Sequence, residues 1–203
     1  MTAEHVSPSK LPMPLSPLDG WQAAFDALPD VVAVSEITFT AQLNLRVDPS
    51  GAAAGAVAKV LGSALPVQPC TSTRSGDFLL LWLGPDEWLI LAPEGAGLEL
   101  ETALREAIGD GPGAVTDVSA QRSTLALSGP ASRELLAKGC SIDLHPKVSP
   151  TGTCVQTLVA QTGIIIVVRD ETASDFLLLV RASFAQYFAA WLIDAGVELT
   201  GGC

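Results

Sequence analysis

Short apolar stretches of strand length recur along this chain. Residues 78–83, 164–168 and 176–180 are apolar at every position. A continuous apolar run is typical of a strand covered on both faces, whereas an alternating run is typical of a strand with one exposed face. Residues 37–47 alternate in this way and predict one strand or two. The pattern therefore predicts buried hairpins in the later part of each half of the chain.

Two segments have the period of an amphipathic helix. From Leu100 to Ile108 the apolar residues fall at helical spacing, with Glu101 and Arg105 paired on the outer side. A second apolar face runs from Phe184 to Leu192 and is the most regular in the chain. Before it, Ser183 and Gln186 have the spacing of a capping box, which predicts the start of a helix.

The two halves of the chain show the same order of signals. Asp48-Pro49 and Gly129-Pro130 each open a helix directly after an alternating stretch. Gly62 and Gly139 each follow that helix, and we expect both to be left-handed cap residues. An apolar hairpin and an amphipathic helix come next in both halves, which indicates an internal duplication.

We therefore predict an α+β fold built from duplicated β-α-β-β-α units. The halves cover about residues 31–110 and 114–197, within one domain over residues 20–203. Residues 1–19 hold four prolines, which disfavour a helix and predict an extended arm. The arm either lies free or drapes over a partner.

Composition narrows the classes of function. Charged residues make up 16% of the 203 residues and the net charge is −11, against about 25% charged residues in an ordinary soluble domain. An acidic chain lacks the basic surface that nucleic acid or anionic lipid requires. We expect neither partner, and we expect a cytoplasmic protein, because no secretion signal or apolar run of roughly 20 residues is present.

The cysteines and aromatic residues favour a structural interpretation. Cys70, Cys140, Cys154 and Cys203 have no metal-ligand spacing, and we expect unpaired thiols. Cys140 and Cys154 are expected to be inert packing residues. The low charge fraction also leaves open that another chain covers much of the surface. Trp82 and Trp88 flank one hairpin and are either core residues or interface anchors. Under the partner hypothesis their region and the hairpin tips contact the partner.

Candidate catalytic residues are scattered rather than clustered. The chain has none of the common phosphate-binding, hydrolase or zinc-protease motifs. His145 is expected to be a satisfied loop residue, and Asp86 and Glu87 a polar hairpin tip. Asp117 is a lone carboxylate that a fold can bury. Arg122 and Arg169 have two interpretations, anion binding or ordinary solvated charges at strand ends. We accordingly predict no catalytic, cofactor-binding or metal-binding residues on this chain.

Four motifs carry a resemblance to the folate-binding aminomethyltransferase superfamily, which includes the glycine-cleavage T-protein. They are Asp117-Val118-Ser119, Ser128-Gly129-Pro130-Ala131, Gly163 before its apolar run, and Ala190-Trp191-Leu192. The resemblance covers roughly residues 31–197 and implies a T-protein-like domain of duplicated units. Within the superfamily, the chain looks most like the gamma-subunit family of heterotetrameric sarcosine oxidases.

The resemblance also shows a departure. In the folate-binding enzymes carboxylates follow the hairpin glycine, and one of them serves folate chemistry. Here Gly163 is followed by branched aliphatic residues, with Ile166 and Val167 in the place of the aspartate. An aliphatic side chain cannot hydrogen-bond a pterin. The Lys138-Gly139-Cys140 sequence resembles an iron–sulfur-assembly branch, but the residues after it differ.

The resemblance implies a non-catalytic structural subunit. The assembly would oxidise sarcosine to glycine and hydrogen peroxide, forming 5,10-methylenetetrahydrofolate when tetrahydrofolate is present. It implies alpha, beta and delta partner subunits, with FAD, FMN, NAD and zinc on those partners and none on this chain. Two alternatives stay open: a free-standing folate-binding enzyme of the T-protein type, and an interaction domain of another complex.

Overall fold

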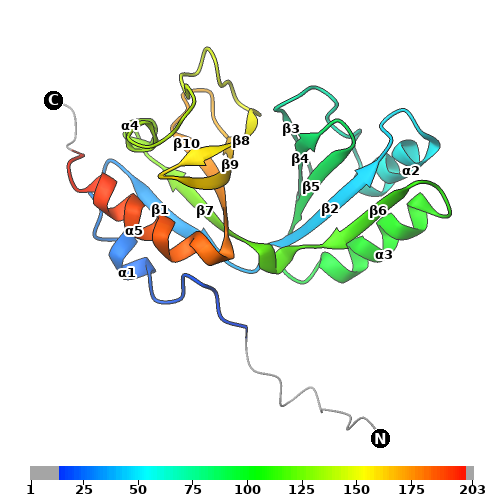
Figure 1. Cartoon of the computed structure of the whole chain (residues 1–203), viewed down its shortest axis with the longest axis horizontal. Helices are drawn as coiled ribbons and strands as arrows, with labels where there is room; N and C mark the ends of the chain where they lie inside the picture. The colour runs from blue at the N-terminus through cyan, green and yellow to red at the C-terminus, as the bar shows by residue number, and fades with distance from the viewer. Residues whose placement is uncertain (1–13, 200–203) are drawn as a thin grey trace, which may run out of the picture.

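The computed structural model describes residues 14–199. Its described part contains two five-stranded antiparallel sheets with helices on their outer faces (Figure 1). The first-half elements are α1 Gln22–Phe25, β1 Ala33–Ile37, β2 Ala41–Val47, α2 Ala52–Leu61, β3 Ser72–Ser75, β4 Phe78–Gly84, β5 Glu87–Ala92 and α3 Gly97–Ile108. The second-half elements are β6 Gly113–Asp117, η2 Ser119–Gln121, β7 Arg122–Ser128, α4 Ser132–Ala137, β8 Cys154–Val159, β9 Thr162–Val168, β10 Asp175–Arg181, η3 Ala182–Phe184 and α5 Ala185–Gly196.

The first strand of each half, β1 or β6, lies in the sheet formed by the other half. Sheet A has the order β1-β7-β10-β9-β8, and sheet B has the order β3-β4-β5-β2-β6. Strand β1 pairs antiparallel with β7, and β6 pairs antiparallel with β2. If sheet B is read from β6, the two sheets have the same order. An exchanged first strand (β1 or β6) is followed by the second, fifth, fourth and third strands of the other half. The sheets therefore do not coincide with the two halves of the sequence.

The exchange settles how residues 37–47 fold. They form the end of β1 and all of β2, and these two strands enter different sheets. The break falls at Phe39, whose backbone φ is 51°, a conformation that a bulky residue rarely adopts. Each half also contains an edge strand, β3 or β8, so the repeated unit is longer than the predicted β-α-β-β-α unit.

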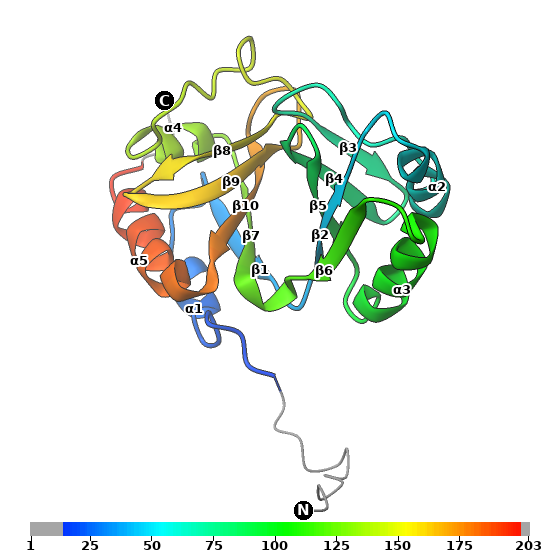
Figure 2. The same ribbon diagram turned by 45° about the vertical axis from the view of Figure 1, so that its right-hand side comes forward.

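Three apolar layers hold the molecule together. One lies between sheet A and the helices α1, α4 and α5, with Phe176 and Phe188 fully buried. A second lies between sheet B and the helices α2 and α3, around Trp88. The third lies between the sheets and contains Leu79, Leu81, Leu89, Leu91, Cys154, Ile165, Val167, Leu177 and Leu179. Figure 2 shows the resulting order of helices, sheet, sheet and helices.

This arrangement explains the apolar hairpins without a partner chain. In β5 and β10 five consecutive residues are buried, at positions 88–92 and 176–180. One face of each strand meets helices and the other face meets the opposite sheet. Of the two interpretations of Trp88, core residue or interface anchor, the structure supports the core, because Trp88 is 0% exposed within this chain. Its indole N–H donates to the carbonyl of Pro66 at 2.8 Å.

Two of the predicted helix boundaries are also wrong. Gln186 makes no capping box with Ser183; its amide donates to the carbonyl of Pro17 at 3.1 Å and so fixes residues 14–19 against α5. Gly62 has a left-handed φ of 70°, as expected. Gly139, in contrast, lacks positive φ; a Cβ there would lie 2.6 Å from the ring of Trp191. Close packing therefore explains Gly139.

Candidate functional site

The carboxylates of Asp86 and Glu87, which sequence analysis singled out, each bind a different side chain of β2. Asp86 forms an ion pair with Arg46 at 2.7 Å, and both side chains are about half exposed. Glu87 accepts a hydrogen bond from the Asn44 amide at 2.8 Å. Both residues thus hold the β4–β5 turn against β2. This agrees with a polar hairpin tip and gives no acid/base pair.

His145 and Arg169 also have local structural partners. The Nδ1 atom of His145 accepts the backbone N–H of Lys147 at 3.2 Å, in an exposed loop. This confirms His145 as a satisfied loop residue. Arg169 forms a two-nitrogen ion pair with Asp175, which joins the ends of β9 and β10. The guanidinium of Arg169 is therefore engaged within the hairpin.

The Asp117-Val118-Ser119 motif connects the two sheets. Asp117 is exposed rather than buried, and its carboxylate accepts the backbone N–H of Ser119 at 2.8 Å and the Ser119 hydroxyl at 2.6 Å. The Ser119 hydroxyl accepts the backbone N–H of Gln42 at 2.9 Å. The motif therefore shapes the crossover from β6 in sheet B to β7 in sheet A.

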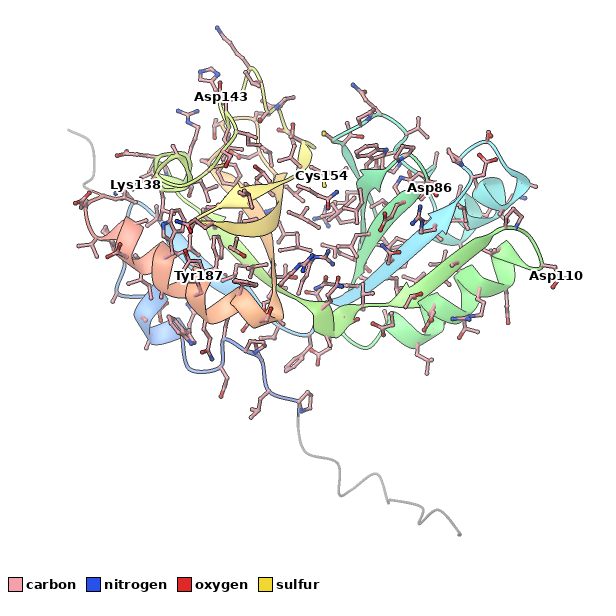
Figure 3. All side chains as sticks on the ribbon, in the orientation of Figure 1. Asp86, Asp110, Lys138, Asp143, Cys154 and Tyr187 are labelled. Carbon is pink, nitrogen blue, oxygen red and sulfur yellow. The ribbon has the colours of Figure 1, made fainter. Side chains whose placement is uncertain are left out.

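The described cysteines are free and differ in exposure. Cys154 is buried between the sheets (Figure 3), and burial raises the pKa of its thiol to about 12, with a further increase from Cys70. Cys140 is half-buried, and burial raises the pKa of its thiol as well. A raised pKa keeps a thiol protonated, and both side chains pack against apolar clusters, Cys154 between the sheets and Cys140 beside the outer layer of sheet A. Cys203 lies outside the described residues.

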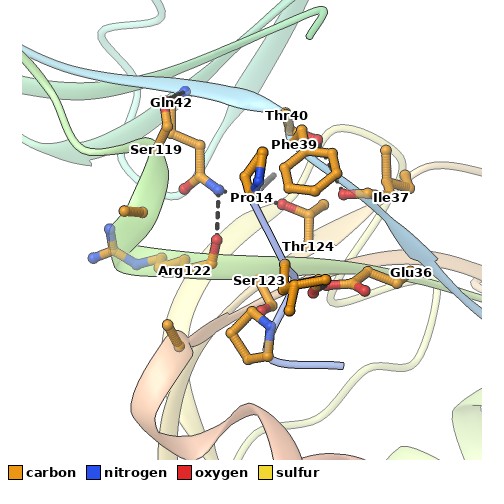
Figure 4. Close-up of a pocket in the computed structure, with 15 residues that line it drawn as sticks. Pro14, Glu36, Ile37, Phe39, Thr40, Gln42, Ser119, Arg122, Ser123 and Thr124 are labelled. Atoms are coloured by element: carbon orange, nitrogen blue, oxygen red, sulfur yellow. Dashed lines mark hydrogen bonds between the residues drawn. The ribbon is translucent and has the colours of Figure 1, made fainter. Parts of the chain in front are cut away.

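A cavity of about 380 Å³ lies beneath residues 14–17, where the chain crosses between the sheets (Figure 4). The Gln42 amide donates to the carbonyl of Arg122 at 2.9 Å, while its own oxygen is buried without a hydrogen-bond partner. Ser16 and Glu36 are hydrogen-bonded at the rim. Phe39 and Ile37 supply apolar walls. Glu36 is the one carboxylate among the described residues that line the cavity.

The aliphatic residues after Gly163 are buried on opposite faces of β9. Ile166 is 0% exposed and packs with the helices on the outer side of sheet A. Val167 is 2% exposed and lies in the layer between the sheets. Gly163 is exposed, and a Cβ added there would meet no atom within 4 Å. Both residues are thus covered by apolar side chains, Ile166 in the outer layer of sheet A and Val167 between the sheets.

Sequence analysis missed two features of this region. Arg181 pairs directly with Arg122 in the register of β10 and β7. Gln42 connects the sheets from inside β2 although its neighbours are apolar. The position of Gln42 inside a buried strand could have predicted a structural hydrogen bond, because buried polar groups are usually hydrogen-bonded. The pairing of Arg181 with Arg122 depends on strand order and was inaccessible to pattern analysis.

Within residues 14–199 the structure brings together no group of three or more His, Cys, Asp or Glu side chains suited to a metal ion. None of the helices in this range combines the length and apolarity that a membrane crossing requires.

The fold places the chain among proteins with the T-protein architecture. The structure matches the glycine cleavage system aminomethyltransferase T from Bartonella henselae with a TM-score of 0.60 and 17% identity, over 89% of this chain and 50% of that chain. The α+β class with two antiparallel sheets is thereby confirmed. At this identity the match establishes the fold alone.

The chain belongs to the sarcosine oxidase gamma subunit family, whose model matches residues 46–198. The gamma subunit from Corynebacterium sp. (strain P-1) is 41% identical over 82% of this chain and 81% of its own length. That from an Arthrobacter species is 39% identical over the same shares. A chain of the heterotetrameric sarcosine oxidase from Corynebacterium sp. U-96, solved with pyrrole 2-carboxylate, matches with a TM-score of 0.85 and 34% identity over 95% of this chain and 99% of that one.

Proposed function

We propose that this chain is the non-catalytic, structural subunit of a cytoplasmic heterotetrameric sarcosine oxidase. Its alpha, beta and delta partners would carry out the oxidation of sarcosine to glycine and hydrogen peroxide, with 5,10-methylenetetrahydrofolate formed when tetrahydrofolate is present. The family membership and the match to a chain of a heterotetrameric enzyme support the assembly.

The observation that carries the non-catalytic role is the filled interface between the sheets. Val167 lies in that interface among leucine and isoleucine side chains, and Ile166 lies in the layer behind it. A folate-binding carboxylate in either position would need polar partners that these layers do not supply. The residues that close this region act by packing, which stabilises a subunit without providing a reaction centre.

Under this proposal the redox groups belong to the partners. FAD, FMN and NAD would be bound by the larger alpha and beta chains, and zinc by the small delta chain. The described residues of this chain contribute the apolar layers, the crossover at Asp117 and Ser119, and the surface that meets the other subunits.

The test is to purify the full-length chain by itself and to titrate it with tetrahydrofolate in an isothermal calorimeter. We expect no flavin absorbance, no sarcosine-dependent peroxide and no heat of folate binding. The same titration on a free-standing aminomethyltransferase of the T-protein type serves as the positive control.

Micromolar folate binding by the isolated chain would contradict the non-catalytic role and would favour a free-standing folate-binding enzyme. Flavin that stays with the purified chain through gel filtration would also contradict it. Assembly with the partner subunits is a separate measurement, so either part of the proposal can fail alone.

A further inference from the structure

Two arginines face each other across neighbouring strands of sheet A. Arg122 begins β7 and Arg181 ends β10, and the two residues are direct cross-strand partners. In the same register Leu179 opposes Thr124 and Leu177 opposes Ala126. Because Leu177 and Leu179 lie in the layer between the sheets and side chains alternate along a strand, the two arginines also point toward sheet B.

Within residues 14–199 the structure shows no ion pair for Arg122 or Arg181, nor for the exposed Arg74 and Arg133; the first two differ in facing each other across two strands. The ion pairs of arginine in this range join Arg46 to Asp86, Arg105 to Glu101, and Arg169 to Asp175.

The electrostatics of Arg122 reflect this lack of a partner. Burial lowers the pKa of its guanidinium and the charge of Arg181 lowers it further, while Glu87 raises it. The carboxylate of Glu87 is already bound to Asn44. The Arg122 guanidinium also donates to the side-chain oxygen of Gln121, and Arg181 is exposed to solvent. Like charges directly opposite each other in a sheet are destabilising, so the pair places positive charge at the end of the interface.

A cavity of about 470 Å³ opens beside this charge. Both arginines line it, together with Gly163 on β9 and Gln156 on β8. Gly163 adds no side chain, and a Cβ there would meet no atom within 4 Å. The Gln156 amide donates to the carbonyl of Leu83 at 3.0 Å, which ties this wall of the cavity to sheet B. Figure 4 shows the Arg122 guanidinium extending away from the cavity under residues 14–17.

We propose that the cavity beside Arg122 and Arg181 binds a small oxyanion, a phosphate or a carboxylate, taken up from solution. Guanidinium groups bind both anions through paired, charge-assisted hydrogen bonds. The anion neutralises the repulsion between the two strands. This site goes beyond the proposed structural function, and its test is independent of subunit assembly.

The test uses the full-length chain at constant ionic strength, with sodium chloride replaced stepwise by sodium phosphate or, in a second arm, by sodium succinate. Calorimetric titration gives the stoichiometry, and thermal melting gives the stabilisation. We expect one saturable site for at least one of the two anions. Its Tm increase is about 5–10 °C when that anion reaches 100 times its Kd. A general salt effect would be the same in chloride.

Substitutions assign the site to the arginine pair. Arg122→Gln and Arg181→Gln each weaken binding about tenfold or more, because each removes a charge-assisted hydrogen bond. Arg133→Gln, at an exposed arginine of α4, leaves the affinity unchanged and is the matched control. Gly163→Asp supplies an internal carboxylate, so it raises the Tm in anion-free buffer and abolishes the response to the anion. Gly163→Asn has the same size without the charge and has neither effect.

Three results would overturn the proposal. The first is the absence of saturable binding of either anion to the wild-type chain. The second is equal loss of binding in Arg133→Gln. The third is unchanged anion binding in Arg122→Gln and Arg181→Gln. If these two variants also fail to assemble with co-expressed subunits, the arginines pair with a carboxylate of a partner chain.

Discussion

Single residues in this chain carry the contacts between layers. Trp88 is the largest fully buried side chain, and its indole N–H satisfies the carbonyl of Pro66 while the rings fill the core of sheet B. Trp82 stands opposite Trp88 in the β4–β5 hairpin but is half-buried. Two tryptophans of one hairpin thus have different energetic roles.

Trp88→Ala should lower the free energy of unfolding by about 3–5 kcal/mol, because it leaves a large cavity in the core and an unpaired carbonyl. Trp82→Ala, the matched control, should cost roughly 1–2 kcal/mol. Urea denaturation followed by circular dichroism measures both. Equal effects of the two substitutions would contradict the placement of Trp88 in the core.

Val167 tests whether the interface between the sheets accepts a carboxylate. Val167→Asp should destabilise the chain by roughly 4 kcal/mol or more, because it buries a charge among aliphatic side chains without partners. Val148→Asp makes the same change at a residue that is 64% exposed and should be nearly neutral. A stable Val167→Asp variant that gains folate affinity in calorimetry would contradict a purely structural interface.

At the scale of elements, a network around Asp170 shapes the β9–β10 turn. Its carboxylate accepts hydrogen bonds from the hydroxyls of Thr172 and Ser174 and from the backbone N–H groups of Ser174 and Asp175. Although desolvation raises the pKa of Asp170, these hydrogen bonds lower it well below the usual range. The turn therefore depends on the ionised form.

Because the pKa of Asp170 is lower in the folded chain than in the unfolded chain, the unfolded chain binds the proton at a higher pH when the pH falls. The contribution of Asp170 is thus present above the unfolded pKa of about 3.9 and is lost as the pH falls toward the folded pKa. Asp170→Asn should cost about 1 kcal/mol at pH 7, since the turn stays partly exposed to solvent, and should flatten the loss of stability between about pH 5 and 3. Asp110→Asn, at an exposed residue labelled in Figure 3, removes a carboxylate outside the network and is the matched control. Identical profiles for both variants would contradict the network.

The elements also show what a sequence pattern can and cannot predict. Periodicity predicted the apolar hairpins and both long helices, because burial on one or two faces determines which positions along the sequence are apolar. It missed β3, whose Ser-Thr-Arg-Ser sequence has no apolar side chain. It assigned Gln186 to a cap, because local spacing does not reveal that the amide reaches residue Pro17. Contacts between distant segments lie outside any local pattern.

At the scale of the whole molecule, the exchange of β1 and β6 binds the two halves into one structure. Neither sheet is complete without a strand from the other half, and the apolar layer between the sheets draws on both. The duplication was visible in the sequence as repeated helix starts and hairpins, but the exchange follows from strand order, which the sequence does not show. We retain the proposal that residues 20–203 form one domain.

The central proposal is that this chain belongs in a heterotetrameric oxidase as a structural subunit. Co-expression of the full-length chain with the alpha, beta and delta subunits of its source, followed by native mass spectrometry, tests it most directly. We expect a complex with one copy of each chain, which fails to assemble when this chain is omitted. A sarcosine-oxidising complex that forms fully without it, while this chain remains a separate monomer, would contradict the account.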